Sequence, residues 1–424
     1  MYSISHYCQG ESHKSSDKPC QDCAFAETTD DTTIAIVCDG HGGERYFRSQ
    51  VGSQIAVEVT KNALWDFIEN ISEKDRKLFA TAPFTSFGVD DADEVQFDTR
   101  QHKLLRWLFS SIISQWNNRI AEDAAQNGLT DWELANVDKK YRTEFLAKRA
   151  NPDSTFEKTY GCTLMAFLQA KDFWLAFHIG DGKFVAMNNV CGKVECSQPI
   201  PWDERCFLNK TTSICDSNAI DEFRYCYQGN GQFPLAVFLG SDGMDDSYGD
   251  GDNLYNFYIQ LYKLILNKGG MEALKELKRS LPKISKVGSK DDMSVAAVYD
   301  ESEPNSTFML LTDYQMEKLQ DEAESIENQI NVLKMKIEDF GDPERLDRAQ
   351  LINLDYAKTD LQRAIDKQER IKKRIISLKG EITRFRKKNE VNDIERTDPL
   401  VSSDDEINDN QSNDEIEIVD TNQE

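Results

Sequence analysis

Long apolar runs are missing from this 424-residue sequence, and none approaches the roughly 20 residues that a helix needs to cross a bilayer. The first residues, Met1 to His6, also lack the basic stretch and apolar core of a secretion signal. An excess of positive charge is absent too, since the formal net charge is −25. A chain of that sign is repelled by nucleic acid and by anionic lipid. We therefore expect a cytoplasmic protein with neither nucleic acid nor membrane as a partner.

The ten cysteines show no paired metal-binding motif. One Cys-x-x-Cys occurs at Cys20 and Cys23, but no second pair stands at zinc-finger spacing. Without a secretion signal, reduced thiols explain these cysteines better than a disulfide framework does. We expect small buried hydrophobes, with structural zinc at Cys20 and Cys23 as the less favoured alternative.

Residues 1–303 alternate short apolar runs with turn clusters. Apolar residues make up 39% of the whole chain, which is sufficient for a core. Five runs predict buried strands, at residues 33–38, 163–168, 174–179, 235–239 and 293–299. Apolar residues at helical spacing predict helices over 46–67 and 102–125. The sequence thus predicts a mixed α and β catalytic domain. The polar stretch 72–100 is predicted to be an exposed insertion within it.

From residue 313 to 390 the pattern changes to two series of apolar residues at alternating steps of three and four. Gly341-Asp342-Pro343 separates the two series, and proline cannot continue a helix interior. We predict an antiparallel helical hairpin whose second helix is the longer. From about Ile371 that helix must contact either the catalytic domain or a second subunit.

The last part of this second helix is basic away from its apolar seam, at 372–374 and 384–388. A solvated coiled-coil face is the favoured interpretation, and a site for an acidic partner is the alternative. Residues 391–424 are rich in Asp, Glu, Asn and Ser, and they cannot bury enough apolar surface to offset the entropy of ordering. They are predicted to form a disordered acidic tail.

Four aspartates stand where apolar runs stop or start. Asp39, Asp181 and Asp242 follow such runs, and Asp291 precedes one. A single aspartate in this position is common turn chemistry. Four of them in one domain favour a site for hard cations, with the carbonyl of Gly40 as a further oxygen ligand.

The ordered set of motifs resembles the PPM/PP2C family of metal-dependent serine/threonine protein phosphatases, in its bacterial type. The matching segments are Gln21-Asp22, Asp39-Gly40-His41-Gly42-Gly43, Tyr160-Gly161-Cys162-Thr163, Gly180-Asp181-Gly182, Ser241-Asp242-Gly243 and Lys290-Asp291-Asp292-Met293-Ser294-Val295. The resemblance implies an α+β fold, an αββα sandwich of two antiparallel sheets flanked by helices. It also implies a centre of two manganese or magnesium ions. The C-terminal hairpin lies outside the resemblance.

The resemblance implies a role for each acidic residue. Asp39 would bridge the two ions, Asp242 and Asp291 would complete one site, and the Gly40 carbonyl would serve the other. Asp181 would join Asp242 at a third, looser ion site that many members have. Two ions of this kind make hydroxide available near neutral pH for attack on phosphorus.

Two further residues are implied in catalysis. Asp22 would hold water bound to a metal ion, and His41 is the candidate general acid for the leaving alkoxide, a contribution worth about a hundredfold or more. The sequence departs from the family at Gln21, where many members have a glutamate ligand. It also has Asp292 where asparagine is common, which adds negative charge beside Asp291.

The arginine with which family members grip the substrate phosphate is not evident, because its expected position falls near Asp17. His13, Lys14 and Lys18 are the candidates to replace it. The leading interpretation is a phosphatase for phosphoserine and phosphothreonine in proteins. A catalytically weak or inactive adaptor that works through its coiled coil, binding a partner or itself, is the alternative, and phosphate removal from a small molecule would use the same centre.

Overall fold

The computed structural model describes residues 1–29, 31–88, 98–150, 156–206, 210–249 and 251–397, and of residues 388–397 it describes the backbone alone. The described residues form two compact units. Of the described residues, the first contains Met1–Val190 and Glu195–Pro304, and the second contains Cys191–Val194 and residues 305–397.

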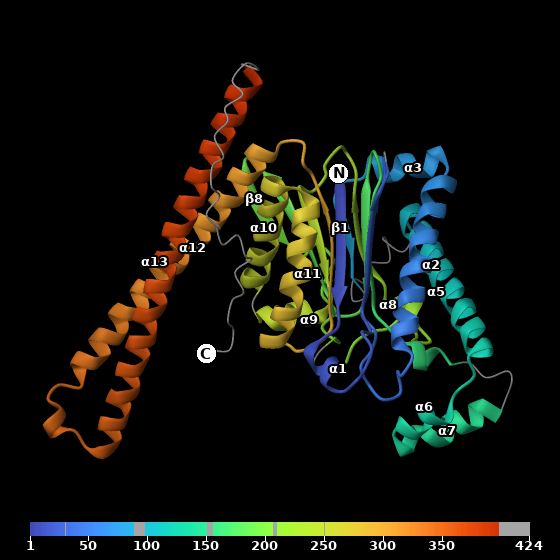
Figure 1. The fold of residues 1–424 in the computed structure, drawn as a ribbon, viewed down its shortest axis with the longest axis horizontal. Coiled ribbons are helices and arrows are strands. Elements are labelled where there is room, and N and C mark those ends of the chain that lie inside the picture. The colour runs from blue at the N-terminus through green and yellow to red at the C-terminus, as the bar shows by residue number, and fades with distance from the viewer. Residues whose placement is uncertain (30, 89–97, 151–155, 207–209, 250, 398–424) are drawn as a thin grey trace, which may run out of the picture. The chain divides into compact units, whose positions relative to one another are not determined.

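Two antiparallel sheets form the centre of the first unit (Figure 1). The five-stranded sheet has the order β1 (Tyr2–Cys8), β11 (Met293–Tyr299), β10 (Ala236–Gly240), β7 (Lys183–Val190) and β8 (Lys193–Ser197). The six-stranded sheet has the order β2 (Cys23–Thr28), β3 (Thr33–Cys38), β5 (Leu164–Gln169), β6 (Trp174–Ile179), β9 (Arg224–Gln228) and β4 (Thr85–Phe87). The five predicted strands correspond to β3, β5, β6, β10 and β11, within one residue at each end.

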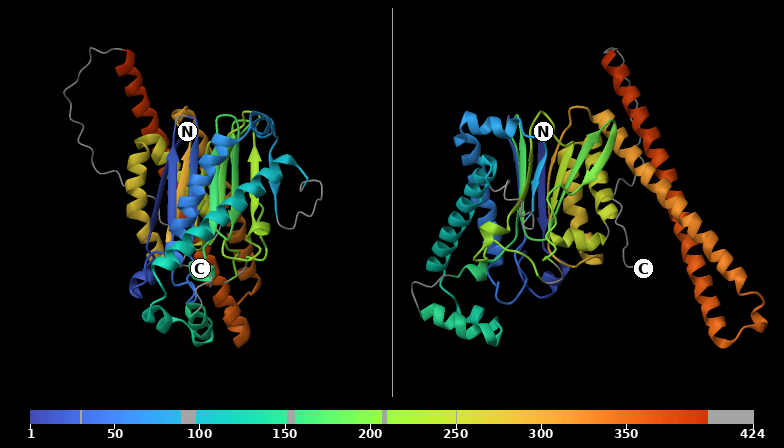
Figure 2. Two further views of the ribbon diagram at one scale, coloured as in Figure 1. Left: turned by 90° about the vertical axis from the view of Figure 1, so that its right-hand side faces the viewer. Right: turned by 180° about the vertical axis from the view of Figure 1, so that it is seen from behind.

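The sheets pack face to face through small and aromatic side chains, including Ala35, Val37, Phe167, Leu239 and Val298. The helices α2 (Ser49–Asn70) and α5 (Arg100–Gln126) cover the outer face of the six-stranded sheet, while α10 (Gly251–Lys268) and α11 (Gly270–Val287) cover the five-stranded one (Figures 1 and 2). Strands such as β3 and β6 are buried along their whole length because a layer lies on each side of them. This four-layer sandwich confirms the predicted fold class.

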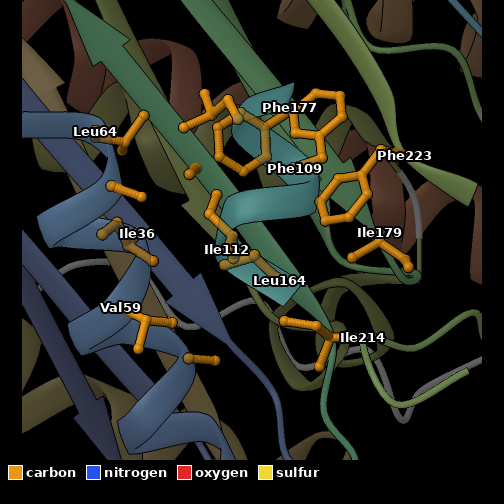
Figure 3. Close-up of a cluster of buried hydrophobic side chains, with 14 of the residues drawn as sticks. Ile36, Val59, Leu64, Phe109, Ile112, Leu164, Phe177, Ile179, Ile214 and Phe223 are labelled. Carbon is orange, nitrogen blue, oxygen red and sulfur yellow. The ribbon is translucent and has the colours of Figure 1, made fainter. Parts of the chain in front are cut away.

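The larger core lies between the six-stranded sheet and its two helices (Figure 3). Ile36 and Phe177 from the sheet meet Leu64 and Phe109 from the helices in this cluster. The indole Nε1 of the buried Trp116 donates to the carbonyl of Gly52 at 3.0 Å. All ten cysteines are free thiols, as expected. Among the described helices, none combines the length and apolar character that crossing a membrane requires.

The prediction of an exposed insertion over residues 72–100 is wrong for its first half. Residues Glu73–Ala80 form helix α3 and Thr85–Phe87 form strand β4, which pairs with β9. The ring of Phe79 is fully buried and that of Phe87 nearly so. Two isolated aromatics in a polar stretch anchor it to the core, and their spacing gave no periodic signal. Residues 89–97, which include the acidic run of residues 90–94, lie outside the described residues.

The shorter helices of the first unit connect these layers. They are α1 (Glu11–Ser15), α6 (Asp131–Asn136), α7 (Lys139–Ala150), the 3₁₀ turn η1 (Glu157–Tyr160), α8 (Ala219–Glu222) and α9 (Asp242–Tyr248). In Figure 1, α1, α6, α7 and α9 gather at one end of the sheets. That end is where the candidate active site forms.

The second unit is an antiparallel helical hairpin, which confirms the prediction for this region (Figure 2). Its helices are α12 (Pro304–Asp339) and α13 (Arg348–Thr397), with the 3₁₀ turn η2 (Pro343–Arg345) between them. The first helix begins nine residues before the predicted start at 313. The seam buries Leu319, Ile326 and Ile371, and near the open end the rings of Phe308 and Phe385 stack. The first residues of the predicted tail, 391–397, belong to α13 rather than to a disordered segment, and the rest of it, from 398 onward, lies outside the described residues.

Substitution of Ile371 by alanine should destabilise the hairpin by about 2–4 kcal/mol, because a buried isoleucine is replaced by a cavity. Ile371 is 2% exposed in the seam, whereas Ile376 on the same helix is 70% exposed. Ile376→Ala is therefore the matched control and should change stability by less than about 0.5 kcal/mol. Urea unfolding of the full chain, followed by circular dichroism, measures both. An equal loss of stability in the two variants would contradict the burial of Ile371 in the seam between the two helices.

Candidate active site

Strand register brings the predicted acidic residues to one end of the two sheets. Cys23 pairs with Cys38, so Asp22 and Asp39 lie side by side where β2 starts and β3 stops. Gly240 pairs with Val295, which places the turn after β10 near the turn before β11. Antiparallel strands put the end of one beside the start of the next. This is why aspartates distant in sequence converge.

Asp39 is held in place by its backbone. Its N–H donates to Oγ1 of Thr163 at 3.1 Å, and its carbonyl accepts from the N–H of Thr163 at 2.8 Å. Gly40, which bridges to Cys162, has no room for a side chain, because a Cβ there would lie 2.6 Å from the carbonyl oxygen of Gln21. The motif Tyr160 to Thr163 thus fixes the backbone of Asp39 without engaging its carboxylate, which faces that of Asp242.

The carboxylates repel one another in this cluster. Burial raises the pKa of Asp39 well above its usual range, and the carboxylates of Asp242 and Asp22 raise it further. Burial, together with Asp181 and Asp291, raises the pKa of Asp242 to about 6. Burial and then Asp292 raise the pKa of Asp22 to about 8. Such shifts mean that the ionised cluster lacks sufficient compensating positive charge in the protein.

The donor atoms of this cluster are of the chemical type that a divalent cation prefers. Asp22 is 1% exposed, and by hydrogen-bond geometry neither of its carboxylate oxygens has a partner among the described residues, although the hydroxyls of Ser241 and Ser294 act on the carboxylate and oppose the rise of its pKa. Oε1 of Gln21 is likewise buried without a partner in the described part of the chain. Buried acceptor oxygens of this kind are rare unless water or an ion satisfies them. Carboxylate and amide oxygens suit Mg²⁺ and Mn²⁺.

One acidic residue of this cluster was missed from the sequence. Asp246 lies one turn after Asp242 on α9, and the charges of Asp181 and Asp291 contribute to its raised pKa after burial and Asp245. The spacing of four residues, which puts two helical side chains on one face, could have signalled it. Burial raises the pKa of Asp181 itself.

His41 follows the cluster directly. Its backbone N–H donates to the carbonyl of Gly161 at 3.1 Å, and its ring lies edge-on to that of Tyr46, with centroids 4.7 Å apart. Burial lowers the pKa of His41 to about 4, although Asp216 opposes the shift. Asp216 is paired with Lys158 at 2.5 Å. Neither residue of this pair was singled out in the sequence, where nothing distinguishes it from surface charges.

His13 is engaged with the acidic turn before β11 and is not free to grip phosphate. Its Nδ1 lies 2.9 Å from Oδ2 of Asp292, and its Nε2 lies 3.9 Å from Oδ1 of Asp291. Asp292 also accepts the backbone N–H groups of Gly10 and Gln21, at 2.6 and 2.5 Å. The extra negative charge at Asp292 therefore has a structural use. It ties the segments before β2 to the turn that carries Asp291.

Lys14 and Lys18, the other candidates for phosphate binding, lie on or just after α1. The Nζ of Lys14 is 4.0 Å from Glu11, and both side chains are more than 40% exposed. The backbone N–H of Lys18 donates to the carbonyl of His13 at 2.9 Å. Their role in phosphate binding stays a prediction.

Helices α6 and α7 are anchored to the loop that follows His41. The guanidinium of Arg48 bonds both carboxylate oxygens of Glu133 on α6, at 2.7 and 3.0 Å, and the hydroxyl of Tyr160 at 2.8 Å. Phe47 packs edge-on against Phe145 of α7, with ring centroids 5.6 Å apart. The buried ion pair and the aromatic contact together fix the orientation of the loop.

Substitution of Glu133 by alanine should destabilise the protein by about 3 kcal/mol, because it leaves the Arg48 charge buried without its main partner. Arg48 is 8% exposed at its side chain, and the more distant Asp123 remains 3.7 Å away. Glu122, whose side chain is 64% exposed beside Arg119, provides the control. Glu122→Ala should cost less than about 0.5 kcal/mol. Thermal melting of both variants at pH 7 measures the difference, and equal losses would contradict the anchoring role.

Comparison with known proteins identifies a family for the first unit. A family model described as protein phosphatase 2C matches residues 9–281, well over half of the chain. Among solved structures, the catalytic domain of the serine/threonine phosphatase PstP, in complex with two manganese ions, is 15% identical, with 70% of this chain and 98% of that one covered and a TM-score of 0.40. Stp1 from Staphylococcus aureus is 15% identical, with coverage of 71% and 96% and a TM-score of 0.40.

A C. elegans sex determining protein is also 15% identical, covers 73% of this chain and 67% of its own, and has a TM-score of 0.42. No curated relative matches the chain. The family assignment rests on the family model, whose match spans most of the first unit and the motifs around Asp39 and Asp242. The chain therefore belongs to the protein phosphatase 2C family of protein phosphatases.

Proposed function

We propose that the protein hydrolyses phosphoserine and phosphothreonine in phosphoproteins, with two manganese or magnesium ions as cofactors. The observation that carries this proposal is the buried cluster of carboxylates whose pKa values are raised by one another and by burial. Asp39, Asp242 and Asp291 would hold the ions, with the Gly40 carbonyl as a further ligand. Asp181, with Asp242, would form a third and looser site.

When bound, the two cations supply a water molecule acidic enough to act as nucleophile near neutral pH. The protein contributes the geometry around it. Asp22, whose carboxylate oxygens are buried and, by hydrogen-bond geometry, unpartnered among the described residues, would orient that water. Gln21 would contribute its amide oxygen where many relatives have a carboxylate, and a neutral ligand holds a cation less tightly. We therefore propose one tightly held and one more weakly held ion.

His41 is proposed as the general acid that protonates the leaving alkoxide. Its low pKa means that the ring is neutral at pH 7 before substrate binds. A phosphoryl dianion beside the imidazole would raise this pKa, because an opposite charge favours the protonated form. The His41 imidazole would then carry its proton when the substrate is bound. We also propose that the protein acts in the cytoplasm, which its ten free thiols support.

Hydrolysis of a phosphothreonine peptide by the native chain, with Mn²⁺ and with EDTA, tests the proposal. We expect turnover only with Mn²⁺, and loss of at least about 100-fold in Asp242→Asn, because one ion loses a ligand. Folded protein without turnover would refute the proposal and favour the adaptor that works through its coiled coil. Turnover on small phosphate esters but on no phosphopeptide would instead assign a small-molecule substrate.

A further inference from the structure

Helix α7 carries an unusual charge for this chain. Its twelve residues, Lys139–Ala150, include five basic side chains and one acidic one, in a protein whose net charge is −25. Lys148 and Arg149 are paired, with Glu144 at 3.2 Å and Asp131 at 2.6 Å. Lys139 and Lys140 have no carboxylate partner among the described residues, and both are exposed.

A further cation lies next to this helix. The guanidinium carbon of Arg45 is 5.1 Å from the ring centroid of Tyr46 and 5.2 Å from that of Tyr141 on α7. The Nζ of Lys140 lies 4.4 Å from the same Tyr141 ring. Within the described part of the chain, Arg45 has no carboxylate partner. Contact with two aromatic rings orients the guanidinium without neutralising it.

These cations are held beside His41. The ring of Tyr46 contacts both the ring of His41 and the guanidinium of Arg45. The charges of Arg45 and Lys158 both act on the His41 imidazole. Because Arg48 and Phe47 anchor the same loop to α6 and α7, the positions of Arg45 and α7 are fixed relative to the site.

The position of His41 indicates which part of a substrate meets these cations. In an in-line displacement, the nucleophile and the leaving group lie on opposite sides of phosphorus. If the protein hydrolyses phosphoserine and phosphothreonine as proposed, the acidic cluster lies on the side of the nucleophile. His41 then lies on the side of the leaving serine or threonine oxygen. Groups beyond His41 therefore meet the peptide that carries the phosphate. The charge of Arg45 acts on the His41 imidazole, and Lys140 contacts the same Tyr141 ring as Arg45, so both cations belong to the His41 side of the site.

We propose that Arg45 and the exposed lysines Lys139 and Lys140 dock acidic residues that flank the phosphoserine or phosphothreonine of the substrate. A chain of net charge −25 repels an acidic segment in general, so a local basic surface has a specific use here. The preferred substrates are phosphoproteins whose phosphorylated residue stands among Asp and Glu. This inference rests on the proposed function and names its substrate class.

The test uses two phosphothreonine peptides that differ only in three residues on each side of the phosphothreonine, glutamate in one and alanine in the other. For the native full chain with Mn²⁺ at low ionic strength, we expect kcat/KM to be about tenfold higher for the glutamate peptide, from two to three exposed ion pairs worth about two- to fivefold each. The preference should fall to about twofold in Arg45→Ala/Lys140→Ala. Salt at 0.5 M should reduce the native preference as well, because it screens exposed charges.

A matched control removes the same charge elsewhere. The variant Lys61→Ala/Arg119→Ala removes one cation from α2 and one from α5. In the native chain Lys61 is paired with Glu27, and Arg119 is paired with Glu58. This variant should keep the native preference, which separates a local contact from an effect of net charge. An equal rate on both peptides in the native chain would overturn the inference while metal-dependent turnover upheld the proposed function. A loss of the same factor on both peptides in Arg45→Ala/Lys140→Ala would overturn it too, since Arg45 would then contact the phosphate itself or support the loop.

Discussion

Substitution of Asp39 by asparagine should lower kcat/KM on a phosphothreonine peptide by at least about 1000-fold. The proposed ligand common to both ions is lost, and several kcal/mol of charge stabilisation correspond to that factor. The same variant should be more stable than the native chain without metal, by about 1–2 kcal/mol, because a buried carboxylate raised in pKa by its neighbours is removed. The hydrogen bonds that place Asp39 come from its backbone, so the asparagine retains them.

The opposite signs of these two effects make the prediction specific. Steady-state hydrolysis with saturating Mn²⁺ gives the first, and thermal melting in EDTA gives the second. Asp245→Asn is the control, since Asp245 lies on α9, the helix of Asp242 and Asp246, but is paired with Lys183 at 3.5 Å. It should change turnover by less than about fivefold, which corresponds to about 1 kcal/mol. Activity of Asp39→Asn within tenfold of native would refute the proposed role, and a lower melting temperature in EDTA would show that its carboxylate stabilises the fold.

The strand ends could be predicted because burial on both sides makes a strand visible as an unbroken apolar run. Thr33–Cys38 and Trp174–Ile179 are such strands, and the aspartates that follow them mark the places where the chain leaves the core. The packing of α3 and β4 could not be predicted in the same way. It depends on Phe79 and Phe87, two single aromatics whose partners lie far away in sequence.

The contacts around the site could not be predicted from the sequence either. Arg45 and Lys158 are ordinary surface cations in the sequence, and only the fold places them beside His41. His13 was a candidate for phosphate binding because it lies near the expected position of the family's arginine, yet its ring contacts Asp292. The sequence pattern shows which residue type follows which strand. The role of that residue depends on the side chains it contacts, and these come from distant parts of the sequence. The residue roles in this site therefore stay predictions until they are measured.

The protein freed of metal by EDTA should lose stability as the pH rises from 6.5 to 8, by about 2 kcal/mol for each carboxylate that keeps its proton over this range. The folded-state pKa of Asp22 is raised to about 8 and that of Asp39 is raised well above its usual value. A group with a raised pKa binds more protons folded than unfolded, so its contribution to stability is lost as the pH rises through the folded pKa. The raised pKa of His13 acts in the same direction.

Histidines with lowered pKa values, such as His41 and His178, act in the opposite direction, but only below about pH 6.5, where they are protonated in the unfolded chain. This is why the pH range of the prediction starts at 6.5.

Urea unfolding at several pH values measures how the free energy of unfolding changes with pH. Mn²⁺ should flatten this pH dependence, because a cation replaces the protons on the carboxylates. Asp22→Asn in EDTA should reduce it, while Asp245→Asn should not. A stability that rises with pH in EDTA would mean that the carboxylates are compensated within the protein itself, and the site would then have no need of a cation.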